Sequence, residues 1–235
     1  MPKKKKAKKE TTVVSSVKDS KPSSSELPSN LLLPASKISP KKCSVEELLP
    51  GFIGVVHNFL TDTECQAWID LVETQQTLEY VQHPASRYMA HRECFRWQRN
   101  DNRIADTLFE RIQQCGVLPT LAFPNEIQPR ACNPNIRLYK YEKGMSFGKH
   151  IDESNAVAGI GQTEVTVLVY LSDCQGGATR FYHPTGKKKE KSIAFSPQKG
   201  AMLLHIHGDR CLEHEADPVV QGLKYILRTD VVYGV

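Results

Sequence analysis

A series of short β-rich segments fills the second half of the chain and limits the folds that it can adopt. Residues 163–171 are rich in β-branched side chains and mostly apolar on both faces, which predicts a strand in the centre of a sheet. Similar segments follow at residues 179–182, 192–195, 201–206 and 223–233, and turns such as Gly176-Gly177 separate them. Several short strands joined by turns predict a β-sandwich or jelly roll.

Two helices are expected before these strands. Thr61-x-x-Glu64 is a capping-box signature that marks the start of the first helix. Its apolar face would be formed by Cys65, Trp68, Ile69 and Val72. A second amphipathic helix is predicted at about residues 102–115. The expected fold class is therefore α+β, a double-stranded β-helix (jelly roll) backed by N-terminal helices.

Charge and composition divide the chain into three parts. Residues 1–42 hold eleven Lys and three acidic residues, a net charge of +8, so the +5 of the whole chain leaves −3 for the rest. We expect this Lys-, Ser- and Pro-rich segment to be a disordered basic tail, and its Lys3–Lys6 run is typical of a nuclear import signal or a nucleic-acid contact. Residues 43–134 are expected to form a helical supporting region and residues 135–235 the β-rich core.

The cysteines and apolar segments bear on the cellular compartment. The seven Cys residues are odd in number and scattered, with no CxxC pair, so free thiols in a reducing compartment are expected. The N-terminal residues are lysine-rich rather than apolar, which argues against a signal peptide. No apolar run has the length of a membrane span. These features favour a cytoplasmic or nuclear protein without a membrane partner.

A candidate metal site lies in the stretch from Asn135 to Asp152, which is expected to form two strands bent at Gly144. His150 and Asp152 stand two residues apart, so on a strand they would share one face. Two other His-x-acid pairs occur, at 91–93 and 207–209. The first lies among several arginines, and the second is followed by only one further His that could be a ligand. A His from another strand would complete a 2-His-1-carboxylate site, the arrangement of non-haem Fe(II) oxygenases. Four residues are candidates for this ligand: His183, His205, His207 and His214.

A cation follows these residues on the last predicted strand. Lys224 comes ten residues after His214 and shares a strand face with Ile226 and Arg228. It could hold the distant carboxylate of a dicarboxylic cosubstrate whose other end chelates the metal. The alternative is a surface His and a Lys on an edge strand.

Five motifs occur in one order along residues 135–235. They are Tyr141-x-x-Gly144-x-x-Phe147-x-x-His150-x-Asp152, Val167-Leu-Val-Tyr170-Leu-Ser-Asp173, Gly176-Gly177-Ala-Thr179-x-Phe181, Lys199-Gly200-Ala-Met-Leu-Leu204 and His214-Glu-x-x-Pro218-Val-x-x-Gly222-x-Lys224. Together they resemble the catalytic domain of prolyl 4-hydroxylase-like Fe(II)/2-oxoglutarate-dependent dioxygenases. One departure is Ala178, where this family usually has Glu.

The resemblance implies a cofactor, a cosubstrate and a set of residue roles. His150, Asp152 and His214 would bind Fe(II), and Lys224 would pair with the 5-carboxylate of 2-oxoglutarate, with Arg228 as a competitor for that role. Tyr170 and Tyr141 are candidates to hydrogen-bond the cosubstrate. The implied reaction is hydroxylation of a C–H bond with conversion of 2-oxoglutarate to succinate and CO2. A protein or peptide is the expected substrate, and a dependence on ascorbate is left open.

Two other interpretations remain. A cupin-like metal protein would use Gly200, His205, His207 and Glu213, although the spacing misses the cupin pattern by about a residue. A nucleic-acid-acting oxygenase is favoured by cations interleaved with aromatic rings, a combination that binds single strands. These are Arg87, Arg92, Arg96, Arg99 and Arg103 among Tyr88, Phe95 and Trp97. The alternative for the arginines is a charged face that pairs with Glu93 and Asp101.

Overall fold

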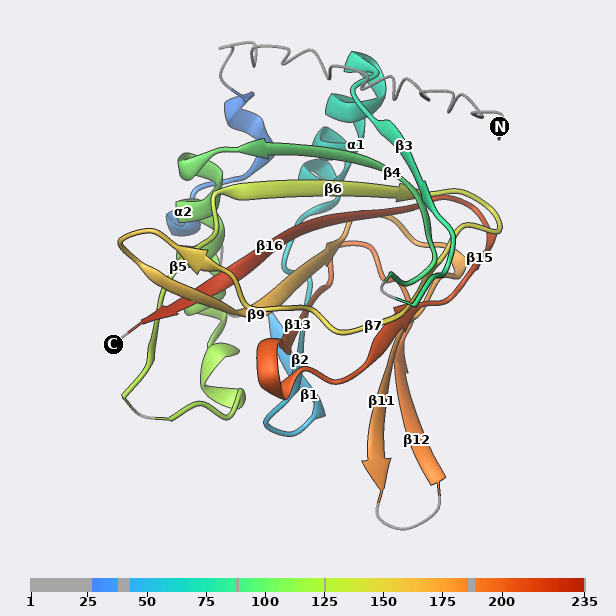
Figure 1. Ribbon diagram of the computed structural model, residues 1–235. Coiled ribbons are helices and arrows are strands. Elements are labelled where there is room, and N and C mark those ends of the chain that lie inside the picture. The colour runs from blue at the N-terminus through green and yellow to red at the C-terminus, as the bar shows by residue number, and fades with distance from the viewer. Residues whose placement is uncertain (1–26, 38–42, 88, 125, 186–188, 235) are drawn as a thin grey trace, which may run out of the picture.

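The computed structural model describes residues 27–37, 43–87, 89–124, 126–185 and 189–234. Its strands form a nearly closed antiparallel barrel, and two α-helices, α1 (Asp62–Gln75) and α2 (Asn102–Cys115), lie on one side of it (Figure 1). Short 3-10 helices span Ser29–Leu31, Ala35–Lys37, Leu118–Thr120 and Gly208–Arg210. The expected α+β jelly roll backed by helices is confirmed.

Fourteen of the strands in the described part of the chain join one sheet. Its hydrogen-bonded order is β1-β2-β13-β9-β16-β6-β4-β7-β14-β11-β12, and β3, β5 and β8 attach beside this path. The strands of the first half are β1 (Ser44–Leu49), β2 (Ile53–His57), β3 (Glu79–His83), β4 (Arg92–Asn100), β5 (Gln128–Cys132), β6 (Asn135–Tyr141) and β7 (Phe147–His150). Those of the second half are β8 (Ala156–Val157), β9 (Gly161–Tyr170), β10 (Gln175–Gly176), β11 (Thr179–Thr185), β12 (Lys189–Phe195), β13 (Met202–Ile206), β14 (His214–Ala216), β15 (Val219–Gln221) and β16 (Lys224–Gly234).

The centre of the sheet is the β13-β9-β16 triplet, so the prediction of a central strand at 163–171 is confirmed. Side chains alternate between its two faces. On β13, Met202 and Leu204 pack in the large core under the helices, whereas Leu203 belongs to the cluster inside the barrel. His205 therefore also points inward, toward the site described below.

The helices are fixed by a cap and a buried ion pair. The capping box of Thr61 and Glu64 is present at the start of α1. The Glu64 carboxylate also pairs with Arg111 of α2, whose Nη1 lies 2.6 Å from Oε1, and both side chains are buried. The Arg111 guanidinium also donates to the carbonyl of Phe59. This pair joins the two helices to each other and to the end of β2.

Strands β7, β14, β11 and β12 form the face of the barrel opposite the central strands. The pairing of β14 with β7 places His214 directly opposite His150. The β11–β12 hairpin extends well beyond the barrel (Figure 1). His150 and His214 are 64 residues apart in the sequence, and the pairing of β7 with β14 brings their imidazoles together.

Two parts of the N-terminal region differ from expectation. Residues 27–37, expected within the disordered tail, are ordered because Leu31 and Leu32 are buried in the helix-side core and the Leu33 amide donates to Glu64 over 2.7 Å. The rest of the expected tail, residues 1–26 and 38–42, lies outside the described residues. The region 43–134 contains the two predicted helices but also β1 to β5, all of which belong to the main sheet.

The remaining sequence expectations concern thiols and membranes. All seven cysteines are free thiols. Among the described residues, every helix is too short or too polar to cross a bilayer.

Candidate metal and cosubstrate site

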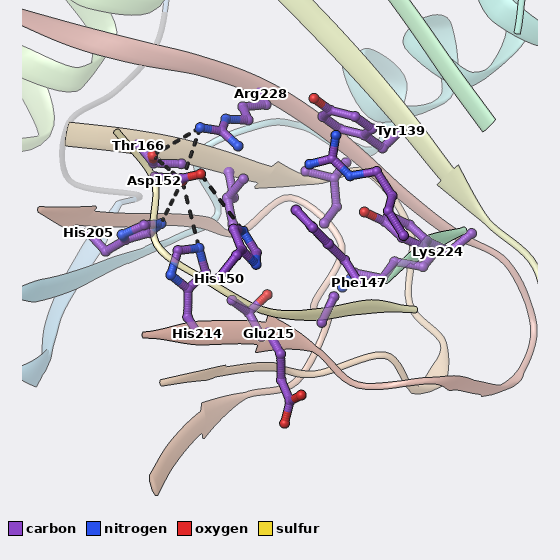
Figure 2. A pocket seen from close by; sticks show the side chains of 16 residues that line it. Tyr139, Phe147, His150, Asp152, Thr166, His205, His214, Glu215, Lys224 and Arg228 are labelled. Atoms are coloured by element: carbon purple, nitrogen blue, oxygen red, sulfur yellow. Dashed lines mark hydrogen bonds and ion pairs between the residues drawn. The ribbon is translucent and has the colours of Figure 1, made fainter. Parts of the chain in front are cut away.

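Three side chains at one end of the barrel could bind a metal ion together. His150 ends β7, Asp152 follows it, and His214 opens β14. One ligand atom from each residue lies within 4.8 Å of the other two. Figure 2 shows both imidazoles turned toward the Asp152 carboxylate, with Nε2 of His150 and of His214 at 3.8 and 3.7 Å from its oxygens.

The tautomers of these imidazoles suit metal binding. Nδ1 of His150 lies 2.8 Å from the Gly148 carbonyl, and Nδ1 of His214 lies 2.9 Å from the Leu212 carbonyl. A proton on Nδ1 that is donated to a carbonyl leaves the Nε2 lone pair free for a metal. Burial lowers the pKa of His150 to about 3 and also lowers that of His214, so both rings are neutral near pH 7. Neutral imidazole is the form that binds a metal.

The Asp152 carboxylate is held by two further side chains. Thr166 Oγ1 donates to Oδ2 over 2.7 Å, and an Nη atom of Arg228 lies 3.0 Å from the same oxygen. Burial alone raises the pKa of Asp152, but the Arg228 guanidinium and then the nearby imidazoles outweigh it and hold the pKa well below its usual range. Asp152 is therefore ionised, as a metal ligand must be.

The donor set fits a divalent transition metal. Two imidazole nitrogens and one carboxylate oxygen converge, which is the 2-His-1-carboxylate arrangement of non-haem Fe(II) oxygenases. Each imidazole is oriented by a carbonyl and the carboxylate by Thr166, which supplies the outer hydrogen bonds that metal ligands need. The residues present thus fit Fe(II), as the sequence predicts.

A buried cation lies in the same cavity. Lys224 is 1% exposed, and its Nζ donates to the Gly177 carbonyl over 2.6 Å and lies 5.3 Å from the centre of the Tyr141 ring. Burial lowers the pKa of Lys224 to about 8. Lys224, Ile226 and Arg228 all line this cavity, so the prediction that they share one face of β16 is confirmed.

The two tyrosines named from the sequence are placed differently. Tyr141 lines the cavity beside Lys224. Tyr170 is buried next to it, where its ring packs against Phe195 and its hydroxyl bonds Thr179 Oγ1 over 2.7 Å. Because Thr179 lines the cavity, Tyr170 is connected to the cavity through its hydrogen bond to the Thr179 hydroxyl. The Ala178 carbonyl accepts from the Asp217 amide over 2.8 Å, which joins this turn to the segment between β14 and β15.

Several cavity residues were not singled out from the sequence. Tyr139, Thr166 and Thr179 line the cavity, as does the Phe147 ring, which stacks on His150 with centroids 3.6 Å apart. The Arg92 guanidinium lies 3.8 Å above that ring. The apolar wall of the cavity comes from Leu168 and Ile226. Alternation along β9 places Thr166 and Leu168 on one face, but both faces of this strand are buried, so the sequence does not show which face is the inner one.

Several residues of the two other interpretations have other partners in the structure. Glu213, expected as a cupin ligand, pairs with Lys149 at the surface over 3.5 Å. Trp97, expected to stack on bases, instead packs edge-on against Trp68 in the helix-side core. Arg103 donates to the Leu27 carbonyl over 2.9 Å. Tyr88 lies outside the described residues.

Known proteins are similar to this chain in sequence and in fold. A sequence model of the 2OG-Fe(II) oxygenase superfamily matches residues 136–229. Probable prolyl 4-hydroxylase 3 of Arabidopsis thaliana is 26% identical in an alignment of 200 positions that covers 73% of this chain and 66% of that protein. A PKHD-type hydroxylase of Burkholderia ambifaria is 25% identical in an alignment of 183 positions that covers 75% of this chain and 71% of that one.

Solved structures show the same fold. The prolyl hydroxylase of Trichoplax adhaerens, in complex with a peptide fragment of the hypoxia inducible factor oxygen degradation domain, has a TM-score of 0.54 at 19% identity. The alignment covers 79% of this chain and 86% of that one. The collagen prolyl hydroxylase of Paramecium Bursaria Chlorella virus-1 has a TM-score of 0.53 at 18% identity, over 78% of this chain and 97% of that one.

The His-Asp-His group inside a jelly roll and the match over residues 136–229 make this chain similar to the 2OG-Fe(II) oxygenases. Within that class the chain is prolyl 4-hydroxylase-like, as its five motifs predict. The cofactors of this family are Fe(II) and 2-oxoglutarate. The chain spans 66% of the length of the Arabidopsis relative, slightly less than two thirds.

Proposed function

We propose that this protein is an Fe(II)- and 2-oxoglutarate-dependent dioxygenase that hydroxylates a C–H bond of a protein side chain. The observation that carries the proposal is the convergence of His150, Asp152 and His214 within 4.8 Å, in a cavity that also contains the buried ammonium of Lys224. A metal at one end and a cation at the other are what a keto diacid requires. When bound, Fe(II) and 2-oxoglutarate supply the oxygen chemistry.

The side chains of the cavity have separate tasks in this proposal. His150, Asp152 and His214 hold the ion, and Arg228 and Thr166 fix the orientation of the carboxylate. Lys224 uses one of its three N–H donors on the Gly177 carbonyl and keeps two for the 5-carboxylate of 2-oxoglutarate. Thr179 and Tyr141 line the same space and are placed to add hydroxyl hydrogen bonds. Leu168 and Ile226 exclude water beside them.

The mouth of the site supports a peptide substrate. The groove beside His150 is lined by aromatic and cationic side chains: Arg92, Arg96, Arg137, Tyr139 and Phe147. Rings offer apolar surface to a side chain such as proline, and arginines bind carboxylates or backbone carbonyls. The relatives named prolyl 4-hydroxylase and the Trichoplax structure with its bound peptide favour the same substrate class.

The test is succinate formation by the full-length protein. With Fe(II), 2-oxoglutarate and a substrate peptide, the parent should form succinate and add about 16 Da, one oxygen atom, to the peptide. His150→Ala and Asp152→Ala should lose both activities, because each removes a metal ligand. His57→Ala is the matched control, since that imidazole pairs with Glu46 outside the cavity. Turnover by the ligand variants at the parent's rate would refute the proposal.

A further inference from the structure

The groove beside His150 carries an excess of positive charge. Its volume is about 360 Å³, which is enough for one or two side chains of a ligand. Among the residues that line it are four arginines and two acidic residues: Arg92, Arg96, Arg137, Arg228, Asp152 and Glu153. The excess of cations lies directly beside the proposed metal ligands.

Two of these arginines have an acidic partner and two do not. Arg137 and Arg228 both pair with the Asp230 carboxylate. Neither Arg92 nor Arg96 forms an ion pair with a described residue, and the Nε atom of each is buried without a hydrogen-bond partner there. A partly buried charge without a partner costs free energy. A ligand that brings a negative charge would therefore stabilise both cations.

Aromatic rings hold these two guanidinium groups in place. Cζ of Arg92 lies 3.8 Å from the centre of the Phe147 ring and 5.8 Å from that of Tyr139. Cζ of Arg96 lies 5.9 Å from the centre of the same Tyr139 ring, and its guanidinium donates to the Gln98 side chain. Stacking on a ring uses the face of a guanidinium and leaves N–H groups at its edge for an acceptor. Because the pair is ordered in advance, binding a carboxylate costs less entropy.

The register of β4 explains why both arginines face the groove. Arg92 and Arg96 are four residues apart, so they share one face of the strand. The pairing of β4 with β6 sets Arg96 opposite Tyr139. Arg99 belongs to the other face of β4, together with Trp97, which packs against the helix-side core.

The arginine pair is close to the proposed metal site. The Phe147 ring stacks on His150 with centroids 3.6 Å apart, and Arg92 lies over the Phe147 ring. An extended peptide advances about 3.3–3.6 Å per residue. A carboxylate that reaches Arg92 would thus belong to a residue about two or three positions from the one that reacts.

We propose that Arg92 and Arg96 bind the side-chain carboxylate of an Asp or Glu in the substrate, so that the substrate is an acidic peptide segment. The inference rests on the proposed function and specifies its substrate class. Guanidinium groups suit a carboxylate because each offers parallel N–H donors. A nucleic acid would need a longer cationic track, and residues 43–235 carry a net charge of −3.

The test compares peptides that differ in one charge. Short fluorescent peptides of Ala, Gly and Ser carry a central Pro and either Asp or Asn, placed in turn at each position up to about three residues away. Their affinity for full-length protein loaded with Mn(II) and 2-oxoglutarate is measured by fluorescence anisotropy without O2. At the preferred position, the parent should bind the Asp peptide about tenfold more tightly than the Asn peptide. Added salt should reduce this ratio.

Variants of β4 assign the preference to the two arginines. Arg92→Met and Arg96→Met keep a long side chain on the rings, and each should lower the ratio of Asp to Asn affinity. The double variant should bring the ratio close to one, with little change for the Asn peptide. Arg99→Met is the matched control, because it removes the same charge from the other face of β4, and it should keep the ratio of the parent.

The outcomes separate this inference from the proposed function. Equal binding of the Asp and Asn peptides by the parent, or no binding of either, would overturn the inference, whether or not the variants fold. A loss in Arg99→Met as large as that in Arg92→Met would do the same. An oligo(dT) strand that displaces the Asp peptide from the parent and depends on both arginines would assign the pair to nucleic acid. Arginine-dependent binding of the Asp peptide without succinate formation under Fe(II) and O2 would support the carboxylate site and refute the proposed function.

Discussion

The guanidinium of Arg228 lies 3.0 Å from the Asp152 carboxylate, although 76 residues separate them in the sequence. This contact resolves a choice that the sequence left open, because Arg228 and Lys224 share a strand face and either cation could meet the cosubstrate. Arg228 pairs with Asp152 and, at 3.3 Å, with Asp230, whereas the Lys224 ammonium donates to the Gly177 carbonyl. The geometry therefore favours Lys224 for the carboxylate of 2-oxoglutarate.

The Arg228–Asp152 pair predicts a metal-dependent stability difference. Arg228→Met leaves a buried carboxylate unpaired and should destabilise the metal-free protein by about 3–5 kcal/mol. A divalent ion supplies the missing positive charge, so Mn(II) should raise the Tm of the variant more than that of the parent. Thermal unfolding with and without Mn(II) measures this. An equal rise in both proteins would contradict the role assigned to the pair.

Lys224 predicts how cosubstrate affinity depends on pH. Burial lowers its pKa to about 8, and only the ammonium form pairs with a carboxylate. The affinity of the metal-loaded protein for 2-oxoglutarate should be constant well below pH 8 and fall above it, by up to about tenfold per pH unit. Lys224→Met should bind about tenfold or more weakly than the parent below pH 8 and lose this dependence. An unchanged affinity in Lys224→Met would transfer the role to Arg228.

Thr166 is expected to act through Asp152. Thr166→Val keeps the shape of the side chain but removes the hydrogen bond to the carboxylate, and should weaken Mn(II) binding about 10- to 100-fold. Thr163→Val on the same strand is the matched control, because that buried hydroxyl accepts from the Asn155 amide instead. Equal metal affinity in the two variants would show that the Thr166 hydroxyl does not orient the ligand.

The helix-side ion pair should affect stability and not metal binding. Arg111→Leu leaves the Glu64 carboxylate buried without its cation and should lower the free energy of unfolding by about 3–5 kcal/mol in urea titrations. Replacing both residues, in Glu64→Gln/Arg111→Leu, should cost less than the sum of the single changes. Additive losses would mean that the two side chains are not coupled.

The sequence predicts site residues that stand at a characteristic spacing along the chain. It does not predict contacts that depend on which residues of two paired strands lie opposite each other. His150, Asp152, His214 and Lys224, named from their spacing together with the family resemblance, line one cavity. Helix α2 was also predictable to the residue, because its apolar stripe is regular. Thr166 and His205 meet Asp152 only through the pairing of β9 with β13, which no local pattern reveals.

Strands with two apolar faces give no signal of direction. Val165, Val167 and Leu204 pack under the helices and not beside the metal site, whereas Thr166 and Leu168 on the other face of β9 line the cavity. Both faces of β9 are buried, so alternation alone cannot assign the inner one. Strand β4 was not predicted, because arginines recur along it and the sequence has few of the apolar positions that usually indicate a strand.

Calorimetric titration of 2-oxoglutarate without O2 tests the central claim most directly, that an ion and an ammonium group hold the two ends of one keto diacid. With Mn(II), the parent should bind 2-oxoglutarate about tenfold or more tightly than without the ion, and Asp152→Ala should lose this gain. Glutarate, which lacks the keto group, should bind weakly with or without Mn(II). If 2-oxoglutarate binds equally well without Mn(II), or equally well to Asp152→Ala, the metal and cosubstrate do not share this site.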